Sequence, residues 1–149
     1  GFGAYKILDR PDSPDGSGRV NAEQQRLLDS LAGHWTSTFY GECYIRVDNG
    51  VFRMIYTYRD GRVYAELSGD KLVGWWNQAE TGTEAQKPEG QVEFTISRSG
   101  SRPGLDGQWR FGTAGTWVRD WHLTYVDADI PPDVMAKFDD TARFKKGTP

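Results

Sequence analysis

Residues 42–68 read ECYIRVDNGVFRMIYTYRDGRVYAELS, in which apolar and polar side chains alternate around two turn dipeptides. The dipeptides Asn49-Gly50 and Asp60-Gly61 are strong signals for tight β-hairpins, because glycine reaches positive φ without a steric penalty. Alternation with a period of two is typical of strands that bury one face. This stretch therefore predicts three antiparallel strands joined by hairpins.

The same pattern continues on both sides of this stretch. Turn signals recur at intervals of roughly 8 to 12 residues, which is typical of barrels and sandwiches. They include Ser68-Gly69-Asp70 and two longer loops at 79–90 and 99–104. We expect strands at 34–40, 42–48, 51–59, 62–68, 71–78, 91–98, 105–112 and 116–126. Eight successive strands of this kind close into an up-and-down antiparallel β-barrel, which leaves no exposed edge; a β-sandwich is the alternative.

A short helix is expected before the first strand. Asn21 is a good N-cap, and Gln24 stands at the reciprocal position of a capping box. Gly33 suits the end of this helix. Three leucines share one helical face: Leu27, Leu28 and Leu31.

A second short helix is expected after the last strand. Pro131-Pro132 suits a first helical turn, and Val134 and Phe138 lie four residues apart on one face. The predicted organisation is an extended arm over 1–20, a helix plus barrel over 21–126, and a C-terminal tail with a helix over 127–149.

Composition excludes several classes of function. The chain has 149 residues, a net charge of −3 and no long basic run, so nucleic acid is not an expected partner. No apolar run approaches the roughly 20 residues of a membrane-spanning helix. The single cysteine, Cys43, excludes an intramolecular disulfide. The chain begins with Gly1 rather than Met, which leaves a secreted or periplasmic origin open, and nothing in the sequence specifies a cofactor.

The alternation divides the strand residues into an inner and an outer set. The predicted inner set is Trp35, Ser37, Phe39, Cys43, Ile45, Val47, Phe52, Met54, Tyr56, Tyr58, Val63, Ala65, Leu67, Leu72, Gly74, Trp76, Val92, Phe94, Ile96, Trp109, Phe111, Trp117, Arg119, Trp121, Leu123 and Tyr125. This interior is aromatic and almost free of charge. A barrel of eight strands is just wide enough to be filled by side chains or to hold one small ligand, and both interpretations stay open.

The start of the first strand resembles a known family. Leu31-Ala32-Gly33-His34-Trp35, after a short helix, resembles the Gly-x-Trp entry of the lipocalins and their calycin relatives. The resemblance covers residues 27–126, although the lipocalin disulfide is absent. It implies that an arginine from the last strand packs across Trp35 and closes one barrel end, a role that Arg119 matches. A buried arginine also needs a ring or carbonyl oxygens as partners.

A second resemblance concerns Met54-Ile55-Tyr56-Thr57-Tyr58, which is similar to a strand of phenolic acid decarboxylases. Thr81-Gly82-Thr83-Glu84 also resembles a loop of that family. The resemblance implies that the hydroxyls of Tyr56 and Tyr58 bind a substrate carboxylate. The catalytic arginine of the family, expected just before Ser68, is replaced by Ala65 and Glu66.

The predicted outer face carries its own candidates. Tyr44, Tyr64 and Trp75 lie outside in this register, and clustered exposed aromatics are typical of protein interfaces. The other interpretation is that the terminal helices cover these rings. His34 and His122 also face outward, near Asp120, but zinc usually takes three or four ligands, so no metal site is predicted.

Three functions follow from these patterns. The first is non-catalytic binding of a small apolar or aromatic ligand in the lumen, with Arg119 closing one end or meeting a ligand carboxylate. The candidate wall is Tyr56, Tyr58, Trp76, Trp109 and Trp121. The second is an accessory subunit with a filled barrel that binds protein subunits of a larger complex through its outer face. The third is an enzyme similar to the phenolic acid decarboxylases.

Overall fold

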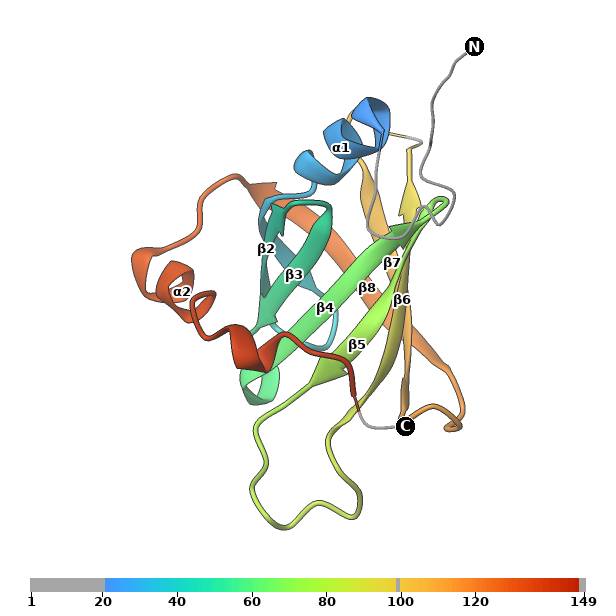
Figure 1. Cartoon of the computed structure of the whole chain (residues 1–149), viewed down its shortest axis with the longest axis vertical. Coiled ribbons are helices and arrows are strands. Elements are labelled where there is room, and N and C mark those ends of the chain that lie inside the picture. Colours follow the sequence, from blue (N-terminus) through green and yellow to red (C-terminus); the bar gives the residue numbers. More distant parts are fainter. Residues whose placement is uncertain (1–20, 99, 148–149) are drawn as a thin grey trace.

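Eight antiparallel strands close into an up-and-down barrel in the computed structural model, which describes residues 21–98 and 100–147 (Figure 1). The strands are β1 (Gly33–Ser37), β2 (Glu42–Asp48), β3 (Val51–Tyr56), β4 (Gly61–Ser68), β5 (Lys71–Asn77), β6 (Glu89–Ser97), β7 (Gly104–Phe111) and β8 (Val118–Asp127). Each strand pairs with the next, and β8 pairs back onto β1, with Ser37 opposite Leu123. The predicted barrel is confirmed, and the closure excludes a sandwich. The predicted arm over 1–20 lies outside the described residues.

The two hairpin turns of the central stretch differ from each other. Asn49 (φ 52°) and Gly50 (φ 78°) form the predicted tight turn between β2 and β3. The strand predicted over 51–59 instead ends at Tyr56, and a 3₁₀ turn, η1 (Tyr58–Asp60), leads into β4. Positive φ falls on Arg59 and Asp60, whereas Gly61 has a φ of −80°. The glycine therefore serves a different purpose at this turn.

Gly61 makes room for an aromatic ring. Tyr56 lies directly opposite Gly61 across β3 and β4. A Cβ atom at residue 61 would overlap the Tyr56 ring. The missing side chain lets this ring lie flat over the strand and point into the barrel, where it is fully buried.

Helix α1 (Ala22–Asp29) covers one end of the barrel (Figure 1). The predicted capping box is present, because Asn21 and Gln24 each accept a hydrogen bond from the other's backbone N–H. Leu28 and Leu31 are fully buried in the main core. The helix ends at Asp29 with Ser30 as its C-cap, so Gly33 is not its terminator. Gly33 instead opens β1 against the backbone of Asp127, where a Cβ would collide.

The arginine at this closed end is not the predicted one. The Trp35 indole donates a 2.8 Å hydrogen bond to the Leu31 carbonyl, and its ring meets the edge of Tyr125 at 5.5 Å. The guanidinium of Arg102, from the loop before β7, lies 3.7 Å from the centre of the Tyr125 ring. Arg119 is exposed near the other end of β8, so its expected packing across Trp35 is wrong.

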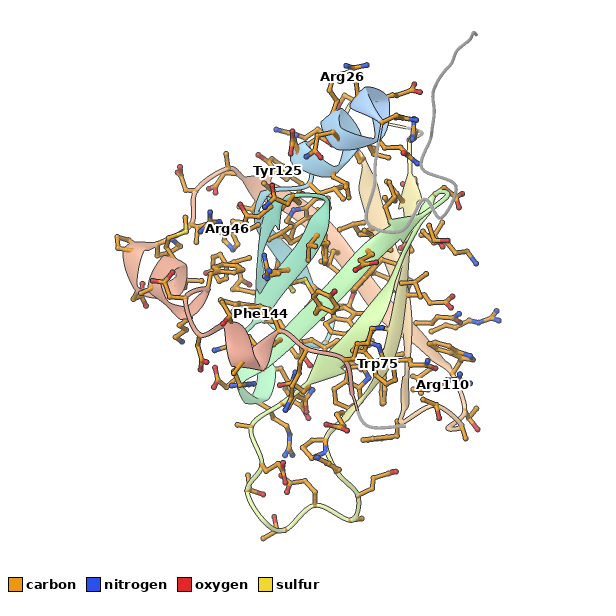
Figure 2. All side chains as sticks on the ribbon, viewed as in Figure 1. Arg26, Arg46, Trp75, Arg110, Tyr125 and Phe144 are labelled. Carbon is orange, nitrogen blue, oxygen red and sulfur yellow. The ribbon has the colours of Figure 1, made fainter. Side chains whose placement is uncertain are left out.

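A second, smaller core lies on the outside of the barrel. Helix α2 (Pro132–Lys137) and the 3₁₀ turn η2 (Thr141–Arg143) belong to a C-terminal segment, residues 130–147, that crosses the outer face (Figure 2). Phe138 and Phe144 stack on each other at 5.6 Å and pack with Ile55 of β3. Within the described ranges, no helix is long and apolar enough to cross a bilayer.

Candidate ligand-binding site

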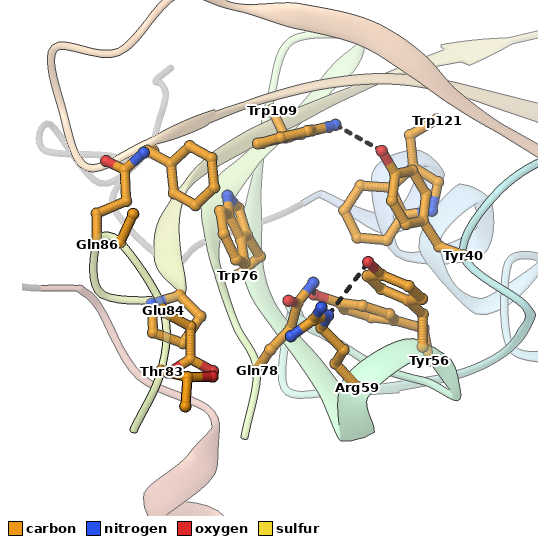
Figure 3. Close-up of a pocket in the computed structure, with 14 residues that line it drawn as sticks. Tyr40, Tyr56, Arg59, Trp76, Gln78, Thr83, Glu84, Gln86, Trp109 and Trp121 are labelled. Carbon is orange, nitrogen blue, oxygen red and sulfur yellow. Dashed lines mark hydrogen bonds between the residues drawn. The ribbon is translucent and has the colours of Figure 1, made fainter. Parts of the chain in front are cut away.

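A cavity of about 410 Å³ opens at the barrel end opposite α1. It lies between the ends of β3, β5 and β7 and the loop 78–88, which hangs below the barrel in Figure 1. Seven of the fourteen residues that line it are aromatic (Figure 3). These are Tyr40, Tyr56, Tyr58, Trp76, Trp109, Phe111 and Trp121.

The inner wall consists of rings that hold one another edge to face. Tyr56 meets Trp121 at 4.8 Å and 81°, and Trp76 meets Trp109 at 5.6 Å and 84°. Edge-to-face contacts are favourable because the positive ring edge meets the negative ring face. The Trp76 indole also donates a 3.1 Å hydrogen bond to the Arg110 carbonyl. These contacts fix the ring planes before any ligand arrives.

A carboxylate holds two rings at the rim of the cavity. The Tyr40 hydroxyl donates to both oxygens of Asp120 at 2.9 and 3.0 Å, and the Trp109 indole donates to Asp120 Oδ1 at 2.8 Å. Burial, followed by the hydrogen bond to Asp120 and the charge of its carboxylate, raises the pKa of Tyr40. Tyr40 is therefore a neutral phenol at physiological pH.

Asp120 reaches this rim because of a bulge in β8. Gly107 pairs with Trp121 and Trp109 pairs with Val118, so Arg119 and Asp120 together stand opposite Gln108 alone. An extra residue of this kind breaks the alternation of inward and outward side chains. The local sequence pattern does not indicate that Tyr40 and Asp120 meet at the site, because their contact joins positions 80 apart in the chain.

The opposite side of the cavity carries hydrogen-bonding groups. Gln78 Nε2 donates to the Tyr56 hydroxyl at 3.0 Å, as Figure 3 shows. Tyr56 is fully buried, so this hydroxyl belongs to the packed base of the wall. Burial raises the pKa of Tyr56, which keeps this hydroxyl protonated. Gln78 is not indicated by the local sequence pattern, whereas Tyr56 is one of the predicted wall residues.

The cavity has an arginine, but it is Arg59 rather than Arg119. Arg59 Nε donates to the Tyr58 hydroxyl at 3.2 Å, and its guanidinium lies 5.5 Å from the Tyr58 ring centre. Both residues line the cavity mouth. Arg119 is exposed outside the barrel, where its Nε donates to Gln108 at 3.2 Å. The bulge beside Arg119 is the physical reason for the difference.

The loop at the mouth is braced by Glu84. Its two carboxylate oxygens accept hydrogen bonds from the backbone N–H of Thr81 at 2.8 Å and of Gly82 at 3.0 Å. The Thr81 hydroxyl adds a third bond at 2.8 Å. The bonds from Thr81, backbone first and then hydroxyl, lower the pKa of Glu84 to about 2. The carboxylate therefore stays ionised and holds the loop beside the cavity.

The predicted wall residues meet in this one cavity. Tyr56, Tyr58, Trp76, Trp109 and Trp121 all line it. Tyr58 does so from η1 rather than from a strand, and about 42% of it is exposed. Two other residues expected inside lie outside: Phe39 is 61% exposed beyond the end of β1, and Trp117 packs under the Arg110 guanidinium at 4.5 Å.

The two tyrosines of the decarboxylase resemblance have different hydrogen-bond partners in this structure. The Tyr56 hydroxyl meets Gln78, whereas the Tyr58 hydroxyl meets Arg59. Ala65, one of the residues where that family has its catalytic arginine, is fully buried in the barrel core. The cavity thus lacks a counter-charge at the place where the resemblance would require one.

The predicted outer-face residues lie beneath the chain's own C-terminal segment. Tyr44 and Tyr64 pack against the small outer core around Phe138 and Phe144. Gly147 lies against the Trp75 ring, so closely that a Cβ there would collide with it. These rings are partly buried within the protein and do not form an open patch (Figure 2).

Each histidine has a separate carboxylate partner. His34 Nε2 lies 2.6 Å from Glu42, and His122 Nδ1 lies 2.7 Å from Asp106. Asp120 turns instead toward Tyr40 and Trp109. In residues 21–98 and 100–147, no three His, Cys, Asp or Glu side chains are grouped so that they could hold a metal ion.

Comparison with protein-family models, with curated proteins and with solved structures gave no match for this chain. The closed eight-stranded barrel is compatible with the calycin resemblance at the level of the fold.

Proposed function

We propose that this protein binds a small, planar, largely apolar molecule in the open end of its barrel, without transforming it. The observation that carries the proposal is the aromatic cavity of about 410 Å³, which reaches from the surface into the barrel. Ligand cavities are commonly about 300–1,000 Å³ and are lined by apolar and aromatic groups with a few placed polar ones. This cavity has that size and that composition.

The shape of the wall favours a flat ligand. Trp76 and Trp109 meet almost at right angles, so a planar molecule can stack on one ring while the other meets its edge. Tyr58, Arg59 and Gln78 also line the cavity, and their polar groups can orient a ligand through hydrogen bonds.

Binding fits the ionisable groups better than catalysis does. Tyr40 and Tyr56 both have raised pKa values, so neither phenol is poised to accept a proton near neutral pH. Glu84 has a lowered pKa and its oxygens are occupied by the loop backbone. These groups supply orientation and hydrogen bonds.

The test is a fluorescence titration with 8-anilinonaphthalene-1-sulfonate, an amphipathic probe with a flat naphthalene ring and an anionic sulfonate. Ala85 lines the cavity from the loop 78–88, so Ala85→Trp places a large ring in the mouth. The matched control is Ala114→Trp, at an exposed turn between β7 and β8 that does not line the cavity. We expect the native protein and the control to bind one probe molecule and Ala85→Trp to lose binding. Equal binding by both variants would contradict the proposal.

A further inference from the structure

The turn that carries Tyr58 and Arg59 into the cavity has an unfavourable backbone. Arg59 and Asp60 have φ values of 51° and 53°, in the left-handed region that glycine adopts far more readily. Two successive residues in this region persist only where surrounding contacts hold them. The conformation of this cavity wall therefore depends on the groups that bind the turn from outside.

Arg143 of the C-terminal segment makes the outer contacts of this turn. Its Nη2 donates to the Asp60 carbonyl at 2.7 Å, and its Nη1 donates to the Asp60 carboxylate at 3.2 Å. The other Asp60 carboxylate oxygen accepts a bond from the buried Arg62 at 2.9 Å. The guanidinium thus holds both the backbone and the side chain of one strained residue.

The same arginine is tied to the end of β5. Arg143 Nε donates to the Asn77 side-chain oxygen at 3.1 Å, and the Asn77 amide donates back to the Arg143 carbonyl at 2.8 Å. The next residue, Gln78, is the one that binds the Tyr56 hydroxyl inside the cavity. A backbone bond of 3.0 Å from Ala79 N–H to the Arg59 carbonyl joins the two cavity walls directly.

The outer core anchors Arg143 in place. The neighbouring Phe144 is buried on Phe138, and the Arg53 guanidinium of β3 lies 5.9 Å from its ring centre. Phe144 and this part of the segment are visible on the barrel surface in Figure 2. The arginine is therefore presented by a packed segment of the chain.

We propose that Arg143 is a positioning residue for the ligand cavity: from the outer face it holds the turn Tyr58–Asp60 and the end of β5 in the arrangement that forms the mouth. The expected effect on ligand affinity rests on the proposed function. The positioning of the turn and of the end of β5 is tested separately. Arg143 does not line the cavity itself. Its effect is transmitted through Asp60 and Asn77.

The experiment measures amide hydrogen exchange and probe binding on the native protein, Arg143→Ala and Arg143→Lys. Three amides report on the mouth: Tyr58 (bonded to Tyr40 O at 3.2 Å), Asp60 (to Thr57 O at 3.3 Å) and Ala79. In Arg143→Ala we expect faster exchange at these amides, unchanged exchange in the β6–β7 ladder, and about three- to tenfold weaker binding of 8-anilinonaphthalene-1-sulfonate. Lysine keeps the charge but lacks the planar guanidinium that binds two partners at once. The exchange rates and the probe affinity of Arg143→Lys should therefore lie between those of the native protein and of Arg143→Ala.

The control is Arg26→Ala, on α1 at the closed end of the barrel, which should match the native protein in both measurements. Unchanged exchange at the three amides in Arg143→Ala would overturn the positioning role, whatever the probe does. Unchanged affinity despite faster exchange would overturn the coupling to the cavity. Failure of the native protein to bind the probe would instead contradict the proposed function, and the exchange results would still decide the structural part.

Discussion

At Gly61, a missing side chain sets the position of a buried aromatic ring at the base of the cavity wall. The Tyr56 ring lies over this glycine and is fully buried, and its hydroxyl is bound by Gln78. The flat packing of an aromatic ring on a cross-strand glycine is therefore part of both the core and the site.

Gly61→Ala should destabilise the protein by about 1–3 kcal/mol, because the new methyl group overpacks a buried ring. Gly100→Ala is the matched control, since its nearest neighbour would be 3.6 Å from the new Cβ and the residue is exposed. We expect the control to change stability by less than about 0.5 kcal/mol. Urea denaturation of both variants measures this difference, and equal midpoints would show that the Tyr56 ring is not confined as described.

Single residues also show where prediction from sequence ends. Tyr56, Trp76 and Trp121 were placed inside because alternation within a regular strand determines which face a side chain takes. Asp120 could not be recognised, since its role depends on Tyr40, far away in the sequence. Arg59 was missed because its direction comes from a positive φ that a non-glycine residue rarely adopts.

Among the elements, the strands were predictable and the departures from regularity were not. Glycine turns and alternation located all eight strands, because each hairpin is a local feature. The bulge in β8 has no local signal, yet it turns Arg119 outward and Asp120 to the rim. The course of the C-terminal segment over β3 and β4 likewise depends on tertiary packing.

The attachment of the C-terminal segment should depend on pH through Asp60. Burial of this carboxyl opposes its ionisation, but the hydrogen bonds and charges of Arg62 and Arg143 outweigh burial and lower the pKa of Asp60. A lowered pKa means that ionised Asp60 stabilises the fold above its unfolded value of 3.8 and that this contribution is lost as pH falls through the folded value.

Carboxyl-carbon NMR titration measures this effect directly. In Arg143→Ala the pKa of Asp60 should rise, so that protonation begins at a higher pH than in the native protein. Glu42, whose pKa is lowered by hydrogen bonds from His34 and Thr36, is the internal control and should titrate unchanged. A pKa of Asp60 that does not move would contradict the contact between Arg143 and the turn.

At the scale of the whole molecule, one end of the barrel is closed and the other is open. At one end α1 and Trp35 fill the lumen with Leu28 and Leu31, whereas at the other end the lumen opens into the aromatic cavity. The sequence predicted the barrel but left open whether its lumen was filled, since that depends on how the rings orient at each end. In this barrel the lumen is filled at one end and open at the other.

The six tryptophans lie in three different parts of the structure. Trp76, Trp109 and Trp121 line the cavity, and Trp35 is buried at the closed end. Trp75 and Trp117 lie on the outer face, against Gly147 and Arg110 respectively. A ligand in the cavity therefore has a defined set of neighbours.

The most direct test is the indole N–H spectrum of ¹⁵N-labelled protein during titration with 8-anilinonaphthalene-1-sulfonate. A planar molecule in the cavity should shift the signals of Trp76, Trp109 and Trp121 through its ring current and leave those of Trp75 and Trp117 unchanged. Shifts confined to the outer-face indoles, or no shift at saturating probe, would contradict the claim that this barrel end is a binding site.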